Sequence, residues 1–188
     1  MKLQQHCTLE MNTYENFLDE SYHKELLSIL TGWEFPWFYQ NTLTAGSMDI
    51  PAFGFNHWLK NDTDPEFSEL IAKMQEKVGA KECYRARCDM TLYNPKGYRH
   101  DFHTDAKHPH RVCIYYVNDS DGDTIIMGED NSIHRVTPKA NKMITFNGKH
   151  LHTGHSPQLH KCRILINANY SLNSVSYTHL TLTTNREV

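Results

Sequence analysis

Residues 84–93 read YRARCDMTLY, and in this stretch the hydrophobic pattern has a period of two. One face of the pattern is apolar or aromatic and comprises Tyr84, Ala86, Cys88, Met90 and Leu92. The alternate face is mainly polar and comprises Arg85, Arg87, Asp89, Thr91 and Tyr93. Such alternation is typical of a β-strand with one buried face. The polar face either meets water or lines the mouth of a barrel, where Arg85 and Arg87 would face a bound molecule.

More short strands are predicted after this segment. They cover residues 111–117, 124–127, 133–136, 142–146, 150–154 and 161–170. Turn sequences separate them, among them Asn94-Pro95-Lys96-Gly97, Asp121-Gly122 and Asn147-Gly148.

Two helices are predicted before the strands. Residues 12–31 have apolar residues at helical spacing and a capping residue at Asn12. Residues 65–78 follow Asp64 as the N-cap and end at Gly79. Helices followed by many short strands predict an α+β chain that is mostly β, with a jelly-roll pair of sheets.

The segment between the helices, residues 33–60, is aromatic-rich and is interrupted by prolines. It is predicted to be irregular, because proline interrupts helices. Its aromatic side chains would form either a lid over a site or the inner wall of the core.

Length and composition predict one globular domain. The chain has 188 residues, of which 39% are hydrophobic and 22% charged, with a net charge of -3. The negative charge argues against a large nucleic-acid interface. No apolar run is long enough to span a membrane, and no secretory signal is found. Five cysteines without a CxxC motif predict reduced thiols and a cytoplasmic location.

The last residues, 175–188, show no pattern of buried positions. Their sequence resembles translated adapter read-through of the kind that contaminates some metagenomic assemblies. An ordinary polar tail is the alternative. The domain is therefore expected to span residues 1–174, with 175–188 as a tail outside the core.

Three residues are arranged as ligands for one metal ion. His103 and Asp105 are two apart in the sequence, so in an extended segment both side chains point to the same side. A third ligand must come from another strand, and His152 qualifies. Two histidines and one carboxylate that leave positions open are the facial triad of non-haem Fe(II) oxygenases. Strand parity alone cannot exclude His150, and His155 is a third candidate.

Arg163 opens the otherwise apolar and amide-bearing strand CRILINANY. A charged residue in a buried strand is costly unless it is paired. Its guanidinium can bind a carboxylate through two parallel hydrogen bonds. An internal salt bridge is one explanation. The far carboxylate of a dicarboxylate co-substrate is the other, and with the triad it points to an Fe(II)/2-oxoglutarate dioxygenase.

Three motifs resemble one branch of a known family. They are LYNPKGYRHDFHTD at residues 92–105, CIYYVN at 113–118 and FNGKHLHTGHSP at 146–157. They are similar to elements of the prolyl 4-hydroxylase-like Fe(II)/2-oxoglutarate oxygenases, including phage and marine-metagenome members. The resemblance covers most of residues 84–170. In the third motif the family's ligand is the histidine before x-G, which selects His152 over its neighbours.

The resemblance implies a fold and a chemistry. The fold would be a double-stranded β-helix, cupin-like, with N-terminal supporting helices. The cofactors would be Fe(II), 2-oxoglutarate and O2, and Tyr93 and Tyr116 would contact 2-oxoglutarate beside Arg163. Because Tyr115 and Tyr116 point to opposite sides of their strand, only one can reach the site. An aspartate at position 105 favours hydroxylation over halogenation, since related halogenases carry a small residue there.

The resemblance also implies a substrate class, a prolyl residue in a peptide or protein. Free amino acids and other small molecules stay open as substrates, and so does a nucleobase. Two other functions compete with the oxygenase. One is a cupin-type metalloprotein that does not use 2-oxoglutarate, and the other is a non-catalytic sensor that keeps the fold.

Overall fold

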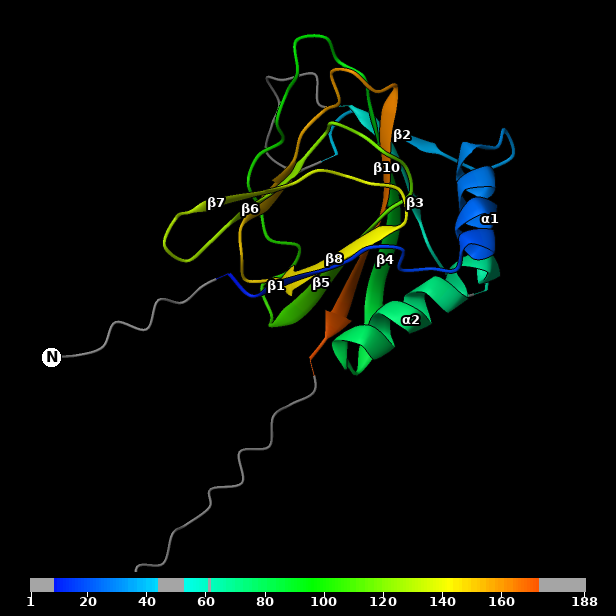
Figure 1. Ribbon diagram of the computed structural model, residues 1–188. Coiled ribbons are helices and arrows are strands. Elements are labelled where there is room, and N and C mark those ends of the chain that lie inside the picture. The colour runs from blue at the N-terminus through cyan, green and yellow to red at the C-terminus, as the bar shows by residue number, and fades with distance from the viewer. Residues whose placement is uncertain (1–8, 44–52, 61, 173–188) are drawn as a thin grey trace, which may run out of the picture.

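The computed structural model describes residues 9–43, 53–60 and 62–172 (Figure 1). The helices are α1 (Glu20–Thr31), the short 3-10 helix η1 (Pro65–Phe67) and α2 (Ser68–Val78). The early strands are β1 (Met11–Tyr14), β2 (Phe38–Gln40), β3 (Gly54–Trp58) and β4 (Glu82–Leu92). The later strands are β5 (His110–Tyr116), β6 (Thr124–Met127), β7 (Ile133–Val136), β8 (Lys142–Asn147), β9 (His152–Gly154) and β10 (Cys162–Ser171).

The strands form two antiparallel sheets. The large sheet has seven strands in the order β1-β8-β5-β10-β4-β3-β2, and the small sheet has the order β7-β6-β9. Two isolated bridges, Arg99 with His155 and His103 with His152, place residues 99–103 beside β9. The mostly β architecture is the jelly roll, or double-stranded β-helix, that the sequence predicts. The small sheet lies to one side of the large one in Figure 1.

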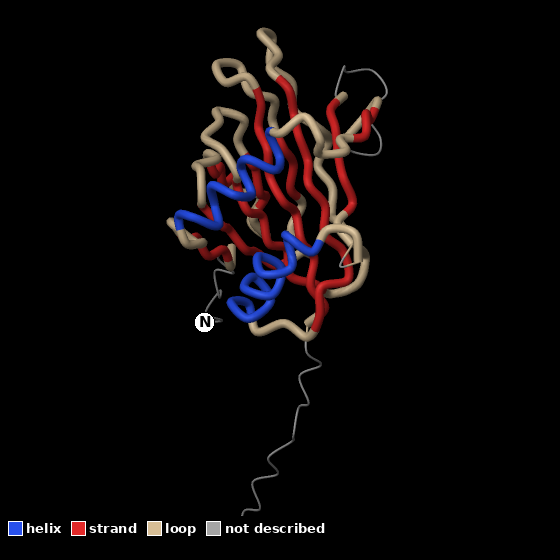
Figure 2. Tube along the Cα trace, turned by 90° about the vertical axis from the view of Figure 1, so that its right-hand side faces the viewer, coloured by secondary structure: helices blue, strands red, loops and turns tan. Residues whose placement is uncertain are grey.

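Both helices cover the outer face of the large sheet, which Figure 2 shows from the helix side. Alternate strand residues point toward them and pack with the apolar stripes of α1 and α2 in one core. The fully buried members of this core include Leu26, Leu70, Cys113, Tyr115 and Ile166. Burial of this kind is the main favourable term in folding.

The inner face of the large sheet faces the small sheet and is divided. A second apolar cluster fills the part under β5 and β8, and includes Val112, Ile114, Tyr116, Ile144 and Phe146. The part formed by β4 and β10 is polar. There the register places Asn167 opposite Arg87 and Asn169 opposite Arg85. The polar side chains Arg85, Arg87, Asp89 and Thr91 of the YRARCDMTLY segment therefore point between the sheets, whereas Tyr93 is half-exposed.

The predicted helix at residues 12–31 is wrong in its first part. Met11–Tyr14 form β1, which pairs with Met143–Phe146 of β8. The helix begins only after Asp19, and a left-handed residue, Asn16 with φ 49°, lies in the turn between. Pairing with a sheet edge satisfies the backbone of this segment, and it outweighs the helical spacing of the side chains.

The second predicted helix is nearly correct. Residues 65–67 form η1 before the α-helix, and Gly79 ends it with φ 60°, a left-handed conformation that glycine adopts without strain. Asp64 makes no cap hydrogen bond. Its carboxylate accepts hydrogen bonds from Lys60 N at 2.9 Å and lies 2.8 Å from His57 Nε2.

Residues 33–60 are less irregular than predicted, because β2 and β3 extend the large sheet. Trp33 is 92% exposed and Trp58 is 48% exposed, so neither is an inner wall of the core. Trp37 packs partly against the helix-side core and donates from Nε1 to Leu30 O at 3.1 Å. Residues 44–52 of this segment lie outside the described residues, as does the tail at 175–188, so the lid stays a prediction.

Within the described ranges, four cysteines are free thiols: Cys83, Cys88, Cys113 and Cys162. None of the helices found in those ranges has both the length and the apolar character needed to cross a membrane.

Candidate active site

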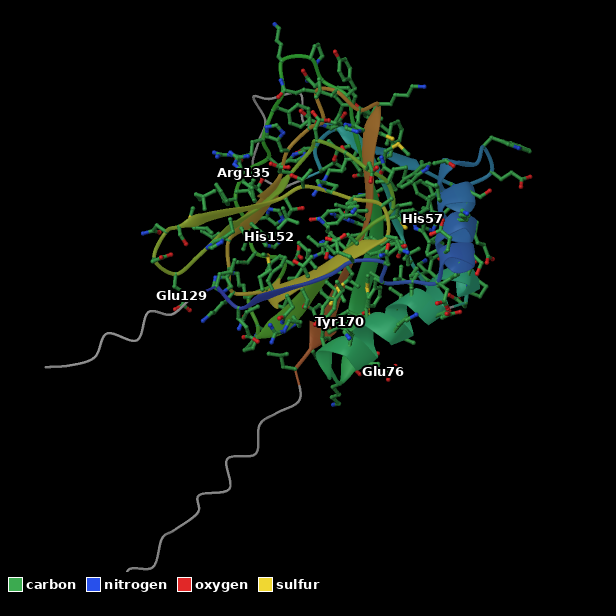
Figure 3. The ribbon with its side chains drawn as sticks, in the orientation of Figure 1. His57, Glu76, Glu129, Arg135, His152 and Tyr170 are labelled. Atoms are coloured by element: carbon green, nitrogen blue, oxygen red, sulfur yellow. The ribbon has the colours of Figure 1, made fainter. Side chains whose placement is uncertain are left out.

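The three predicted ligands meet between the two sheets. His103 and His152 lie side by side, because His103 N donates to His152 O at 3.0 Å and His152 N donates to His103 O at 2.9 Å. One possible ligand atom from each of His103, Asp105 and His152 lies within 4.8 Å of the others. Figure 3 shows His152 in this space between the sheets.

Hydrogen bonds fix the orientation of both imidazole rings. Nδ1 of His103 lies 3.1 Å from Asp101 O, and Nδ1 of His152 lies 3.2 Å from His150 O. A carbonyl can only accept, so each Nδ1 carries the proton and each Nε2 keeps its lone pair. These Nε2 atoms lie 3.8 Å and 3.7 Å from the Asp105 carboxylate. Burial, with the neighbouring His152, lowers the pKa of His103 and favours the neutral ring.

The Asp105 carboxylate is held as an anion. Its side chain is 3% exposed, and burial alone would raise its pKa. The Arg85 charge and the hydrogen bond from Asn167 favour the anion, and the pKa lies well below the usual range. Asn169 Nδ2 donates to Oδ2 at 2.8 Å and Asn167 Nδ2 at 3.2 Å, while Arg85 Nη1 donates to the backbone oxygen at 3.2 Å. Such contacts behind a ligand fix its direction.

This donor set fits a divalent transition metal. Two neutral imidazole nitrogens and one carboxylate converge, and their hydrogen-bonding partners point them toward the same space. Three ligands on one side leave other coordination positions for exogenous groups. The cavity beside the triad is lined by Arg87, Asp89, His100, Thr124, Gly154 and Arg163, among others.

Arg163 is the second feature of this cavity. Arg163 is 6% exposed, and its Nη2 donates to Thr124 Oγ1 at 2.6 Å. Its Nε has no hydrogen-bond partner. Among the described residues no carboxylate lies within ion-pair distance of Arg163, so an internal salt bridge does not explain its burial. A Cβ at position 154 would lie 2.8 Å from Arg163 Nη1, so Gly154 makes room for the guanidinium.

The two neighbouring tyrosines separate as predicted. Tyr116 is fully buried on the inner side and donates to Thr124 Oγ1 at 2.7 Å. Burial raises its pKa to about 12 although the Arg163 charge opposes this, so it stays a neutral donor. Tyr115 points into the helix-side core, where its hydroxyl lies 2.8 Å from His23 Nδ1 and donates to Asn141 Oδ1 at 3.1 Å.

Tyr93 is 50% exposed and is not among the residues that line the cavity. Its backbone N donates to Lys161 O at 2.9 Å. Tyr116 is not among the lining residues either, so the contacts of Tyr93 and Tyr116 with 2-oxoglutarate stay predictions from the resemblance alone. Of the competing histidines, His150 supplies the carbonyl that orients His152, and His155 Nδ1 lies 2.9 Å from Ser156 O. Neither belongs to the converging ligand set.

Sequence reasoning missed Thr124 and His100. Thr124 reaches Arg163 only because β6 pairs with β9 and places it opposite Gly154, a register that no local pattern indicates. His100 is 4% exposed, and neither of its ring nitrogens has a hydrogen-bond partner. Burial, with the nearby Arg163 charge, lowers its pKa to about 4. The only sequence signal for His100 as a site residue was its place just before the HxD element.

Comparison by sequence finds no matching family model and no matching curated protein. Comparison by structure finds many similar folds. A prolyl-4-hydroxylase from Pseudomonas putida has a TM-score of 0.64 at 14% identity, over 88% of this chain and 94% of that one. A prolyl hydroxylase from Trichoplax adhaerens, in complex with a hypoxia inducible factor peptide fragment, has a TM-score of 0.68 at 15% identity, over 86% and 83%.

A third similar structure is HygX from Streptomyces hygroscopicus with nickel and 2-oxoglutarate bound. Its TM-score is 0.60 at 10% identity, over 89% of this chain and 84% of that one. These likenesses show the fold. At such low identity the chemistry has to be argued from the side chains of this chain.

Proposed function

We propose that the chain is an Fe(II)- and 2-oxoglutarate-dependent oxygenase that hydroxylates a C–H bond. One observation carries the proposal: the buried Arg163 guanidinium lines the same cavity as His103 and His152 of the converging triad, and no carboxylate among the described residues lies within ion-pair distance of it. A buried charge without a partner is strongly unfavourable. A dicarboxylate that reaches from the metal to Arg163 would remove that cost.

Each residue has a role in this proposal. His103, Asp105 and His152 would hold Fe(II), and Arg163 with Thr124 would bind the far carboxylate of 2-oxoglutarate. Tyr116 holds the Thr124 hydroxyl in place through its 2.7 Å hydrogen bond. When bound, iron and 2-oxoglutarate supply the coupled chemistry in which O2 yields succinate, CO2 and a hydroxylated product. The protein positions these groups and limits the access of water to them.

The electrostatics of the cavity support a dianionic co-substrate over the alternatives. A cupin-type metalloprotein without 2-oxoglutarate would leave Arg163 buried with no carboxylate within ion-pair distance among the described residues, which is unfavourable. A non-catalytic sensor would need the same ligands and the same arginine. Turnover of 2-oxoglutarate separates the sensor from the oxygenase.

The first substrate to test is a prolyl residue in a peptide. Two of the similar folds are prolyl hydroxylases, and one of them is in complex with a peptide fragment. The aspartate at position 105 supports hydroxylation, because its carboxylate occupies the ligand position that a halide would need.

The test is a coupled turnover assay. Purified protein is given Fe(II), O2, 2-oxoglutarate labelled at C1, and a library of proline-containing peptides. The proposal predicts labelled CO2 and succinate in equal amounts, with one added oxygen atom in a consumed peptide. Decarboxylation without any modified peptide would retain the oxygenase and reject the prolyl substrate. Absence of decarboxylation with iron bound would reject the oxygenase.

A further inference from the structure

Two arginines lie beside the metal ligands on the inner face of β4. Arg87 is opposite Asn167 and Arg85 is opposite Asn169 in the pairing of β4 with β10. Both asparagines donate to the Asp105 carboxylate. Arg85 Nη1 lies 3.5 Å from Asp105 Oδ1, so its guanidinium touches the triad. Arg87 also lines the cavity that contains His103 and His152.

Both guanidiniums contact one aromatic ring. Arg85 Cζ lies 5.2 Å and Arg87 Cζ 5.5 Å from the centroid of the Trp58 ring. The Arg85 side chain is 22% exposed and the Arg87 side chain 16%, whereas Trp58 is 48% exposed. The cluster of Arg85, Arg87 and Trp58 therefore connects the metal site with the solvent. A molecule that approaches the metal from this side would contact it.

The hydrogen-bonding capacity of Arg87 is largely unused. Its Nε lies 2.8 Å from Asp89 Oδ1, but neither atom makes a well-directed hydrogen bond. No hydrogen bond to its η nitrogens is found in the described parts of the chain. Arg85 uses Nη1 for Asp105 and offers its other nitrogens. Planar guanidiniums with free N–H groups are suited to carboxylates and phosphates.

The charges of the loaded site leave a positive excess at this cluster. Fe(II), dianionic 2-oxoglutarate, Asp105 and Arg163 together are neutral. Arg85 and Arg87 add two positive charges. Besides Asp105, which is already counted, Asp89 is the one carboxylate within ion-pair distance of them among the described residues, so one positive charge is left over. An oxyanion on the substrate would balance it.

We propose that the substrate carries a carboxylate or phosphate group, which Arg87 and Arg85 bind while Trp58 contacts the adjoining apolar part. This inference rests on the proposed function, because it assumes that 2-oxoglutarate occupies Arg163. It narrows the substrate class to anionic molecules or to peptides with an acidic residue close to the oxidised carbon.

The test measures binding in a form of the protein that cannot turn over. Zn(II) replaces iron, and N-oxalylglycine, an inert isostere of 2-oxoglutarate, fills the Arg163 site. Benzoate and the neutral benzamide are then titrated while tryptophan fluorescence is followed, with Trp58→Phe to identify the signal. Acetyl-Asp-Pro-amide and acetyl-Asn-Pro-amide form a second pair, which distinguishes a peptide carboxylate from a free acid.

The acidic member of at least one pair should bind about tenfold more tightly, as expected for a charge-assisted hydrogen bond. Arg87→Gln should abolish this preference, and Arg87→Lys should retain part of it. Arg111→Gln is the matched control, because Arg111 also pairs with a carboxylate, Glu10 at 3.0 Å, but away from the site.

Equal affinity for both members of both pairs, or no binding of any probe by the wild type, would overturn the proposal. An acid preference that persists in Arg87→Gln would also overturn it. N-oxalylglycine binding, and its loss in Arg163→Ala, reports separately on the proposed function.

Discussion

The two faces of the large sheet are built from the same strands, but they differ in how many of their buried polar atoms have hydrogen-bond partners. On the outer face the Tyr115 and Tyr170 hydroxyls have partners, since Tyr170 donates to Ile71 O at 2.8 Å and Tyr115 to Asn141. Tyr170 lies next to α2 in Figure 3. Most of the buried side-chain atoms without a hydrogen-bond partner in the described residues lie on the inner side of this sheet or face it, on Arg87, Asp89, His100, Arg163, Asn167 and Asn169. On the outer face, Arg111 and Thr145 each have one such atom.

This difference separates stability from binding. Unpartnered buried polar atoms are rare in folded proteins, and each one is costly unless a ligand satisfies it. The outer face contributes packing with the helices, whereas the inner face keeps polar groups for molecules that enter later. Variants on the two faces should therefore change different measurements.

Asp105→Ala should have the largest effect on the inner face. It removes the only carboxylate of the triad, so Fe(II) affinity should fall by more than the roughly 10–100-fold that is typical of losing a partner behind a ligand. Equilibrium dialysis with Fe(II) measures it, and the exposed Asp62→Ala is the control. Unchanged Fe(II) affinity and full turnover in Asp105→Ala would contradict the triad assignment.

Leu70→Ala should have the largest effect on the outer face. Leu70 is fully buried between α2 and the sheet, and such truncations cost about 2–5 kcal/mol. Chemical denaturation should show this loss in the free energy of unfolding. The affinity of the folded variant for 2-oxoglutarate should match the wild type. A marked loss of that affinity would mean that the two faces are coupled.

His100 should make the metal-free protein less stable in mild acid. Its folded pKa of about 4 lies below the ordinary value of 6.5, so the unfolded state binds more protons between these values. Stability from this group is complete above pH 6.5 and is lost as the pH falls to 4, by up to about 3 kcal/mol. Denaturation across this range should give a flatter profile for His100→Asn. Identical slopes for both proteins would contradict the assignment.

Tyr115→Phe and Tyr116→Phe should have the smallest effects, and each variant should change a different measurement. Tyr115→Phe should lower the free energy of unfolding by about 1 kcal/mol, because it loses hydrogen bonds in the helix-side core. Tyr116→Phe should weaken 2-oxoglutarate binding several-fold, because Thr124 then loses one of its two donors. Calorimetric titration and denaturation of both variants provide the comparison. If Tyr115→Phe weakened 2-oxoglutarate binding and Tyr116→Phe lowered the free energy of unfolding instead, the assignment of the two tyrosines to the two faces would be wrong.

The sequence predicted the chemistry of the inner face better than its surroundings. HxD spacing, a distal histidine and a buried arginine are local signals. His103, His152 and Arg163 line one cavity, and Asp105 converges with the two histidines. The position of Thr124 beside Arg163 depends on strand register, and the formation of β1 depends on pairing with a strand that is distant in the sequence. Such long-range pairing leaves no local pattern, and the helical spacing at residues 12–18 was misleading for this reason.

The most direct test of the central claim is anaerobic. Metal-free protein receives Fe(II) and then 2-oxoglutarate, while visible absorption is followed for the metal-to-ligand charge-transfer band of the chelate, with Arg163→Ala measured beside it. The account predicts a band in the wild type that needs about 100-fold more 2-oxoglutarate in the variant, since one partner of a buried charge pair is lost. A wild type that binds iron but shows no band would contradict it.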